Sequence, residues 1–192
     1  MKTIAPTDSR YLPLVQEKCC CVPASISMVM YRHGIPLIPQ EVLGWHLGLT
    51  TKKQFKNLFW KVRLSKTHCG TQISKKKFEP NKVFKKLKIP LKFRHHKTKQ
   101  MNLAEFTAFM VKAVKQGRDI LLCFDHPTLN GEKKPGWGHV CVLDRVYPNK
   151  GSVRMMDPQP GQPKWRAVKI KDLKKAIDVH TDVAGFWELT KV

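Results

Sequence analysis

Long apolar runs and a recognisable targeting segment are missing from this sequence. No stretch of about 18 or more apolar residues occurs, so no transmembrane segment is predicted. Residues 1–14 mix Asp8 and Arg10 with prolines, unlike the apolar centre of a secretory signal. The 192 residues are 42% hydrophobic, which is ordinary for a globular protein. We therefore expect one globular domain over residues 1–192 and a cytoplasmic location.

Paired cysteine motifs are also missing. The six cysteines stand at positions 19, 20, 21, 69, 123 and 141. Three of them are adjacent, and Cys123 and Cys141 fall in apolar runs typical of core strands. No C-x-x-C pair has a matching second pair, and His95-His96 has no ligand cluster beside it. The pattern predicts no disulfide framework, no metal or other cofactor, and a reduced compartment.

Acidic residues are scarce: 14 Asp and Glu stand against 36 Lys and Arg, a formal net charge of +22. The excess is concentrated in residues 52–99. Such a charge favours nucleic acid or an acidic partner but does not predict a fold. Aromatic residues interleaved there suit either a nucleic-acid surface or core faces, and their periodic spacing favours the core. They are Phe55, Phe59, Trp60, Phe78, Phe84 and Phe93.

The order of the predicted elements is helices first and sheet last. An apolar helix is predicted over 23–33, since proline suits a first turn and Gly34 suits its end. Further helices are predicted at 39–47, 80–87, 103–116 and 171–177, and strands at 91–94, 120–124, 140–143, 153–156 and 185–189. Residues 51–64 show helical spacing within a basic, insertion-like region around 50–80. The class predicted is α+β, with helices packed on a carboxy-terminal antiparallel sheet.

Cys21 is the candidate nucleophile because it directly precedes the first predicted helix. Unpaired N–H groups and the positive end of the helix dipole favour a thiolate at such a position. Cys19 and Cys20 are predicted to lie in the approaching loop. The alternative is that all three cysteines are small buried hydrophobic residues.

His139 and Asp157 are the candidate base and orienting group for that thiol. A hairpin turning near Asn149 sets positions 139 and 157 nearly opposite each other at one edge of the sheet. His139 alone reads equally as a strand-end histidine, and Asp157 as a turn residue before proline. Asp144 is a rival orienting group, but it lies at the far end of its strand in this register.

These residues resemble a known family. Gln16, Cys21-Val22-Pro23-Ala24-Ser25, Gly138-His139-Val140-Cys141-Val142 and Asp157-Pro158 with Gly161 follow one another in the chain. In kind and order they resemble papain-fold cysteine peptidases of the bacteriocin-processing, double-glycine leader group. The resemblance implies a papain-like fold with nucleophile Cys21, general base His139, orienting Asp157 and oxyanion donor Gln16.

The sequence departs from that family in two places and leaves two functions open. Val22 stands where the family usually has glycine, and Gln16 is one residue closer to the cysteine than is common there. The first hypothesis is a cysteine peptidase that cleaves a peptide or isopeptide bond in a peptide or protein substrate. The alternative is a catalytically silent module of the same fold that binds nucleic acid or an acidic protein through its basic surface. The oligomeric state is not predicted.

Overall fold

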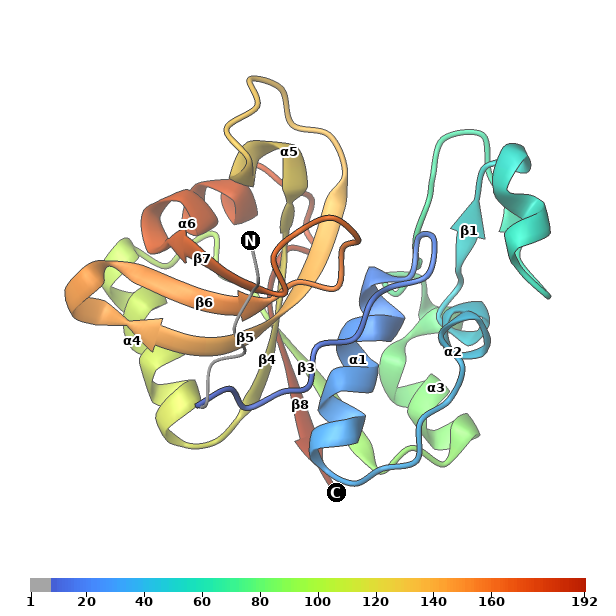
Figure 1. The fold of residues 1–192 in the computed structure, drawn as a ribbon, viewed down its shortest axis with the longest axis horizontal. Helices are drawn as coiled ribbons and strands as arrows, with labels where there is room; N and C mark the ends of the chain where they lie inside the picture. Colours follow the sequence, from blue (N-terminus) through green and yellow to red (C-terminus); the bar gives the residue numbers. More distant parts are fainter. Residues whose placement is uncertain (1–7) are drawn as a thin grey trace.

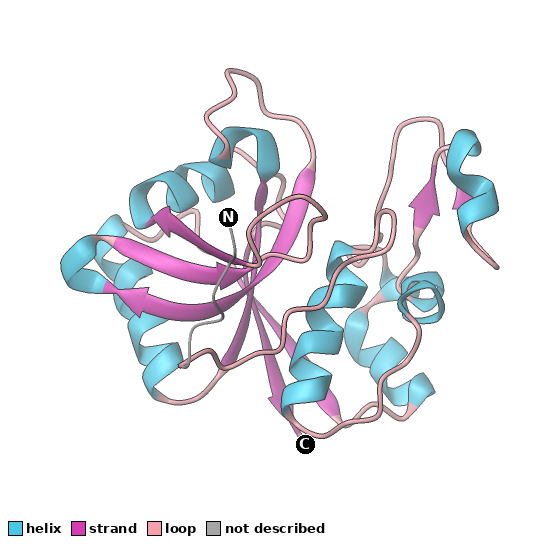
Figure 2. Cartoon of the chain, viewed as in Figure 1, coloured by secondary structure: helices cyan, strands magenta, loops and turns pink. Residues whose placement is uncertain are grey.

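A six-stranded antiparallel sheet lies at the centre of the computed structural model, which describes residues 8–192 (Figures 1 and 2). The strands are ordered β3-β8-β4-β5-β6-β7. Their bounds are β3 Leu91–His96, β4 Asp119–Asp125, β5 Gly138–Tyr147, β6 Ser152–Met156, β7 Trp165–Lys169 and β8 Gly185–Lys191. β8, the last strand in the sequence, is an interior strand of the sheet, because it pairs with β3 on one side and β4 on the other.

Helices cover both faces of this sheet (Figure 1). α4 (Leu103–Lys115) and α6 (Ile170–Asp178) pack on one face, and α1 (Cys21–Arg32) packs on the other. The alternation of side chains along a strand divides β4 between two cores. Leu121 and Cys123 face the α1 side, while Leu122 and Phe124 face α4 and α6. The mixed class with an antiparallel sheet is confirmed.

Most predicted helices are present with shifts of one or two residues at their ends. The remaining α-helices are α2 Gln40–His46, α3 Pro80–Leu87 and α5 His126–Leu129. The first helix begins at Cys21, two residues before the predicted start, and Cys20 is its N-cap. Among the described residues, no side-chain cap hydrogen bond is present at that end. Within that range its first backbone N–H groups therefore have no intrahelical partner and no capping side chain.

The region around 50–80 differs from its prediction. In place of a helix over 51–64, the chain forms β1 (Thr50–Thr51), a 3₁₀ helix η1 (Lys53–Leu58) and β2 (Arg63–Leu64), with β1 and β2 parallel. A second 3₁₀ turn, η2, covers Lys76–Phe78, and a third, η3, covers Pro148–Lys150 in the β5–β6 hairpin. None of the η1 residues is buried, so an α-helix there has no face to pack.

A disulfide between Cys19 and Cys69 ties this region to the loop before α1. Their Cα atoms are 5.4 Å apart although 50 residues separate them in the chain. The six cysteines were predicted to form no disulfide framework. That prediction is wrong for Cys19 and Cys69, and the reduced compartment inferred from it loses its support. The sequence does not indicate which of the three adjacent cysteines pairs, and Cys69, the partner, has no other cysteine near it.

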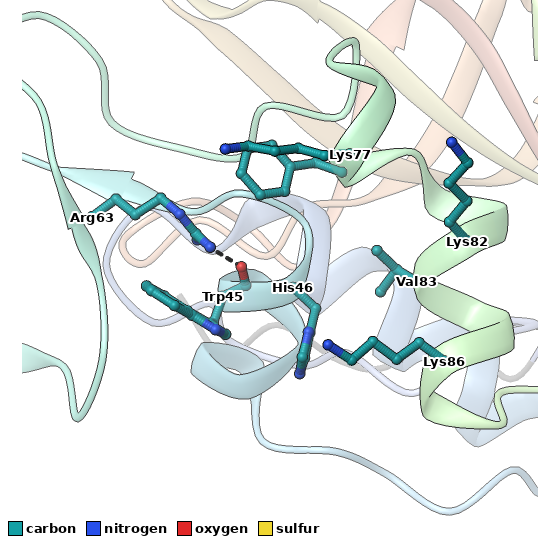
Figure 3. Close-up of a pocket in the computed structure, with 8 residues that line it drawn as sticks. Trp45, His46, Arg63, Lys77, Lys82, Val83 and Lys86 are labelled. Carbon is teal, nitrogen blue, oxygen red and sulfur yellow. Dashed lines mark hydrogen bonds between the residues drawn. The ribbon is translucent and has the colours of Figure 1, made fainter.

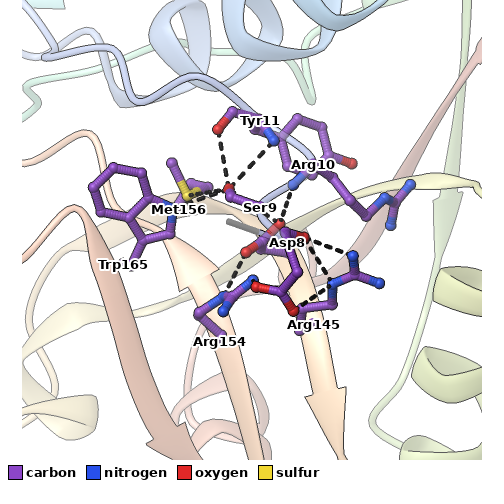
Figure 4. A network of polar contacts seen from close by, with 9 residues as sticks. Asp8, Ser9, Arg10, Tyr11, Arg145, Arg154, Met156 and Trp165 are labelled. Carbon is purple, nitrogen blue, oxygen red and sulfur yellow. Dashed lines mark hydrogen bonds and ion pairs between the residues drawn. The ribbon is translucent and has the colours of Figure 1, made fainter. Parts of the chain in front are cut away.

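Residues 8–18, the amino-terminal strap, cross from the sheet to α1 (Figures 1 and 4). The Arg10 N–H donates to Asp144 Oδ1 (2.8 Å), and Arg154 Nε donates to Asp144 Oδ2 (2.6 Å). Trp165 Nε1 donates to Ser9 Oγ (2.9 Å). Asp144 therefore fixes the strap to β6, and its carboxylate is not available to His139. Within residues 8–192 no helix is long and apolar enough to cross a bilayer, and the first seven residues of the predicted signal-free stretch lie outside that range.

Candidate active site

Three separate parts of the chain meet between the sheet and α1. Figure 1 shows the start of α1, the start of β5 and the loop between β6 and β7 near one another at the centre of the view. Ser25 Oγ, one turn into α1, donates to the Val140 carbonyl (3.1 Å), which lies one residue after His139. The β5–β6 register pairs Val142 with Met156, so Asp157 follows opposite Cys141, two residues after His139. The predicted convergence of positions 139 and 157 at one edge is confirmed.

His139 and Asp157 form a buried pair. His139 Nε2 lies 2.8 Å from Asp157 Oδ1, and both side chains are fully buried. The Gln159 N–H also donates to Asp157 Oδ1 (2.9 Å), and Arg166 lies 3.4 Å from Oδ2. A carboxylate with this many donors accepts the Nε2–H of His139 and fixes the ring in one orientation.

The surroundings favour the charged form of each member of this pair. Burial alone lowers the pKa of His139, but Cys141, Asp157 and Cys21 outweigh it and raise that pKa well above its usual value. Burial alone raises the pKa of Asp157, while the hydrogen bond and charge of His139, with Gln159 and Arg166, lower it. The contact between the two groups therefore favours an imidazolium beside a carboxylate over the two neutral forms.

Cys21 differs from the other free cysteines. Among the four free cysteines, all of them within the described residues, Cys21 alone is half-buried, whereas Cys20, Cys123 and Cys141 are buried. Burial raises the pKa of the Cys141 thiol to about 12, which keeps it protonated. His139 Nδ1 is buried, and no atom of residues 8–192 forms a hydrogen bond with it. It is thus the ring nitrogen left to exchange a proton with a thiol.

Gln16 lies where the strap passes the loop after β6. Its backbone N–H donates to the Pro158 carbonyl (2.9 Å), which ties it to the residue after Asp157. Its side-chain Oε1 is buried and has no hydrogen-bond partner among the described residues. Val22, where the family usually has glycine, is 5% exposed and packs in the core between α1 and the sheet.

Sequence reasoning missed an aromatic and basic group around His139. The indole of Trp137 stacks on the His126 ring with centroids 4.1 Å apart, and both rings stand edge-on to His139 at 5.8 and 5.1 Å. Burial, followed by the charge of His139, lowers the pKa of His126 to about 4. Trp137 lies two residues before His139 in the sequence, which is a usable signal. Nothing local marks His126 or Arg166.

The same corner contains a set of metal-ligand atoms. Donor atoms of His139, Cys141 and Asp157 all lie within 4.8 Å of one another. One imidazole, one thiol and one carboxylate are ligand types that suit a zinc ion. The Nε2 of His139 already contacts Asp157, so metal binding and this hydrogen bond compete for the same atoms.

No protein-family model and no curated protein matches this sequence. A solved structure does: that of a "putative C39-like peptidase from Bacillus anthracis" superposes with a TM-score of 0.54. The two sequences are 16% identical, and the match covers 94% of each chain. At this identity the likeness shows the fold. The chain has the fold of a C39-like peptidase structure over most of its length.

Proposed function

We propose that this protein is a cysteine peptidase of the papain-like type, with Cys21 as nucleophile and His139 as general base. The fold likeness is consistent with this reaction class. The order Gln16, Cys21, His139, Asp157 along the chain is that of the double-glycine leader peptidases which the sequence resembles. The reaction proposed is hydrolysis of a peptide or isopeptide bond in a peptide or protein.

Before the acylation step, His139 Nδ1 has taken the proton of the Cys21 thiol, so a thiolate lies beside an imidazolium, and the thiolate sulfur attacks the substrate carbonyl carbon. The carbonyl oxygen becomes an oxyanion, for which the uncapped start of α1 supplies the Cys21 N–H. The Gln16 side-chain amide is the second proposed donor. His139 then returns the proton to the leaving nitrogen, the C–N bond breaks, and a thioester on Cys21 remains.

In the deacylation step, water replaces the amine. His139 Nδ1 takes a proton from the water molecule, and the hydroxyl attacks the thioester carbon. The C–S bond breaks, the carboxylic acid product leaves, and the proton stays on His139, which restores the thiolate and the imidazolium. Asp157 holds the Nε2–H throughout, so the ring presents the same nitrogen in both steps.

The observation that carries this proposal is the buried His139–Asp157 pair, whose Nδ1 has no partner among residues 8–192. Cys141, Asp157 and Cys21 raise the pKa of this imidazole, and Cys21 is the half-buried free thiol among them. A fully buried ion pair costs desolvation free energy. The packing of the buried helix α1 against the β5–β6 hairpin does not need this pair, whereas a thiol peptidase needs it to position and charge the imidazole.

Hydrolysis of a mixture of fluorogenic peptides tests the proposal. The wild-type protein is expected to cleave members of the mixture, and Cys21→Ala is expected to reduce that rate to background. Cys123→Ala is the matched control, since it removes a buried thiol of β4 that has no role in the reaction. Cleavage that survives in Cys21→Ala, or that both variants lose equally, contradicts the assignment of the nucleophile.

A further inference from the structure

A second, strongly basic pocket lies between α2, α3 and the chain around β2, built from residues that the peptidase proposal does not use (Figure 3). Its volume is about 210 Å³. Five basic side chains from four separate segments converge on it. They are His46 of α2, Arg63 of β2, Lys77 of η2, and Lys82 and Lys86 of α3.

The positive charge in this pocket is poorly compensated. None of the residues lining it carries a carboxylate. The Glu79 carboxylate lies 3.8 Å from Lys82 Nζ, but both side chains are largely exposed, so that pair is weak. Glu41, also on α2, accepts a hydrogen bond from the Trp60 N–H (2.8 Å). Like charges gathered in this way repel each other, and a bound anion removes that repulsion.

Arg63 is held in place for such an anion. It donates to the Trp45 carbonyl (2.7 Å), and its guanidinium lies 3.6 Å from the Trp45 ring centroid and 4.7 Å from that of Phe78. Phe78 in turn rests on Gly48, where a Cβ atom would lie 2.4 Å from the ring. Only part of the five-donor guanidinium is used by these contacts. The remaining N–H groups are fixed at little further entropic cost.

The titration of His46 agrees with an excess of positive charge. Burial lowers its pKa, and the charges of Lys86, Arg63 and Lys61 lower it further. An anion in the pocket opposes those charges and therefore raises the same pKa. This provides a spectroscopic reporter inside the pocket.

We propose that this pocket binds a phosphoryl group of a small phosphate ester or polyphosphate. A phosphoryl group carries roughly −1.5 to −2 charges at neutral pH, so it matches several cations better than one carboxylate does. The pocket is smaller than the roughly 300–1,000 Å³ of sites for drug-sized ligands, which favours a compact anion. Arg63 covers the Trp45 face, so this ring does not offer the stacking surface that single-stranded nucleic acid uses.

Calorimetric titration of the full-length protein with sodium tripolyphosphate tests this proposal. The test variant is Lys82→Gln with Lys86→Gln, two exposed lysines one turn apart on α3. The matched control is Lys171→Gln with Lys175→Gln, which are also exposed, one turn apart on α6, and change the net charge equally. We expect the first variant to bind about tenfold more weakly or worse, the equivalent of roughly 1.4 kcal/mol, and the control to bind as the wild type does.

Further outcomes decide the ligand class. Tripolyphosphate is expected to raise the pKa of His46, followed by NMR, in the wild type and in the control variant. No binding by the wild type, or equal weakening in both variants, overturns the proposal. If an oligoglutamate peptide binds as tightly as tripolyphosphate, and this binding also depends on Lys82 and Lys86, the pocket binds carboxylates. A single-stranded oligonucleotide that binds more tightly through them assigns the pocket to nucleic acid. Either result overturns the phosphoryl assignment. Loss of peptidase activity in Cys21→Ala leaves this test unaffected.

Discussion

The His139–Asp157 contact requires the desolvation of two groups, an imidazole and a carboxylate, which lowers the stability of the folded protein. Both side chains are fully buried, and the pair tends to be charged on both sides. Arg166 at 3.4 Å and the Gln159 N–H reduce the cost by satisfying the remaining carboxylate positions. The function that we propose for the pair is to hold a protonatable imidazole in one orientation, with its Nδ1 directed at Cys21.

Asp157→Asn tests the role of the carboxylate. Asparagine keeps an acceptor oxygen at the same place but removes the charge that favours the imidazolium. We expect kcat/KM for peptide hydrolysis to fall by roughly 10²-fold to 10⁴-fold, the usual contribution of a positioned general base. Thermal unfolding by circular dichroism checks that the variant is folded, since Arg166 loses its partner. An unchanged kcat/KM in a folded Asp157→Asn variant contradicts the orienting role.

His126 gives a prediction about acid stability. Its folded-state pKa of about 4 lies below the ordinary value of 6.5, so the folded protein resists protonating it. The stability it contributes is complete above pH 6.5 and is lost as the pH falls toward 4. His126 is 6% exposed, and the loss amounts to at most roughly 3 kcal/mol.

Urea unfolding at pH 7 and pH 4.5 measures this loss. The wild type is expected to lose more unfolding free energy between the two pH values than His126→Gln, which cannot take up the proton. Carboxylate titrations are common to both proteins and cancel in the comparison. Equal losses show that His126 is not kept neutral by the fold.

Elements that bury a face were predictable from the sequence, and those held by tertiary constraints were not. α3 matches its prediction at both ends, since Val83 and Phe84 are buried. The 51–64 segment has helical spacing but buries no residue of η1, and pairing of β1 with β2 shapes it instead. β7 was missed because this edge strand is only half-buried and lacks an alternating apolar pattern. Pairing with β6 forms it.

The same distinction applies to the candidate site. Cys21, His139 and Asp157 were found because each begins or ends an element whose apolar pattern is clear. Arg166 and His126 were missed because they reach this corner only through the pairing of β7 with β6 and the position of α5. The roles assigned to Cys21, His139, Asp157 and Gln16 stay predictions until they are tested.

Cys69→Ser tests the disulfide as a structural element. The bond closes a 50-residue separation and holds Cys19, which has a left-handed φ of 63°, in the loop two residues before Cys21. We expect its removal to lower the unfolding free energy by about 2–4 kcal/mol, by relieving a constraint on the unfolded chain. Urea unfolding measures this, and a reducing agent should destabilise the wild type by a similar amount. A further effect of reduction on Cys69→Ser itself rules out this bond as the source.

Across the whole molecule, the proposed chemistry depends on parts of the chain that are distant in sequence. α1 brings Cys21 from one face of the sheet, β5 brings His139, and the β6–β7 loop brings Asp157 (Figure 1). The strap carries Gln16 to the same loop through its bond to Pro158. The basic pocket is built from α2, β2, η2 and α3, so the two proposed sites share no lining residue.

Whether His139 activates Cys21 can be measured by the rate at which iodoacetamide alkylates each cysteine near pH 7, followed by peptide mass spectrometry. We expect Cys21 to react much faster than Cys20, Cys123 and Cys141, and His139→Ala to slow the alkylation of Cys21 alone. Folding of that variant is checked by circular dichroism. Equal rates at the four free cysteines, or a Cys21 rate unchanged in a folded His139→Ala variant, contradict the claim that His139 activates Cys21.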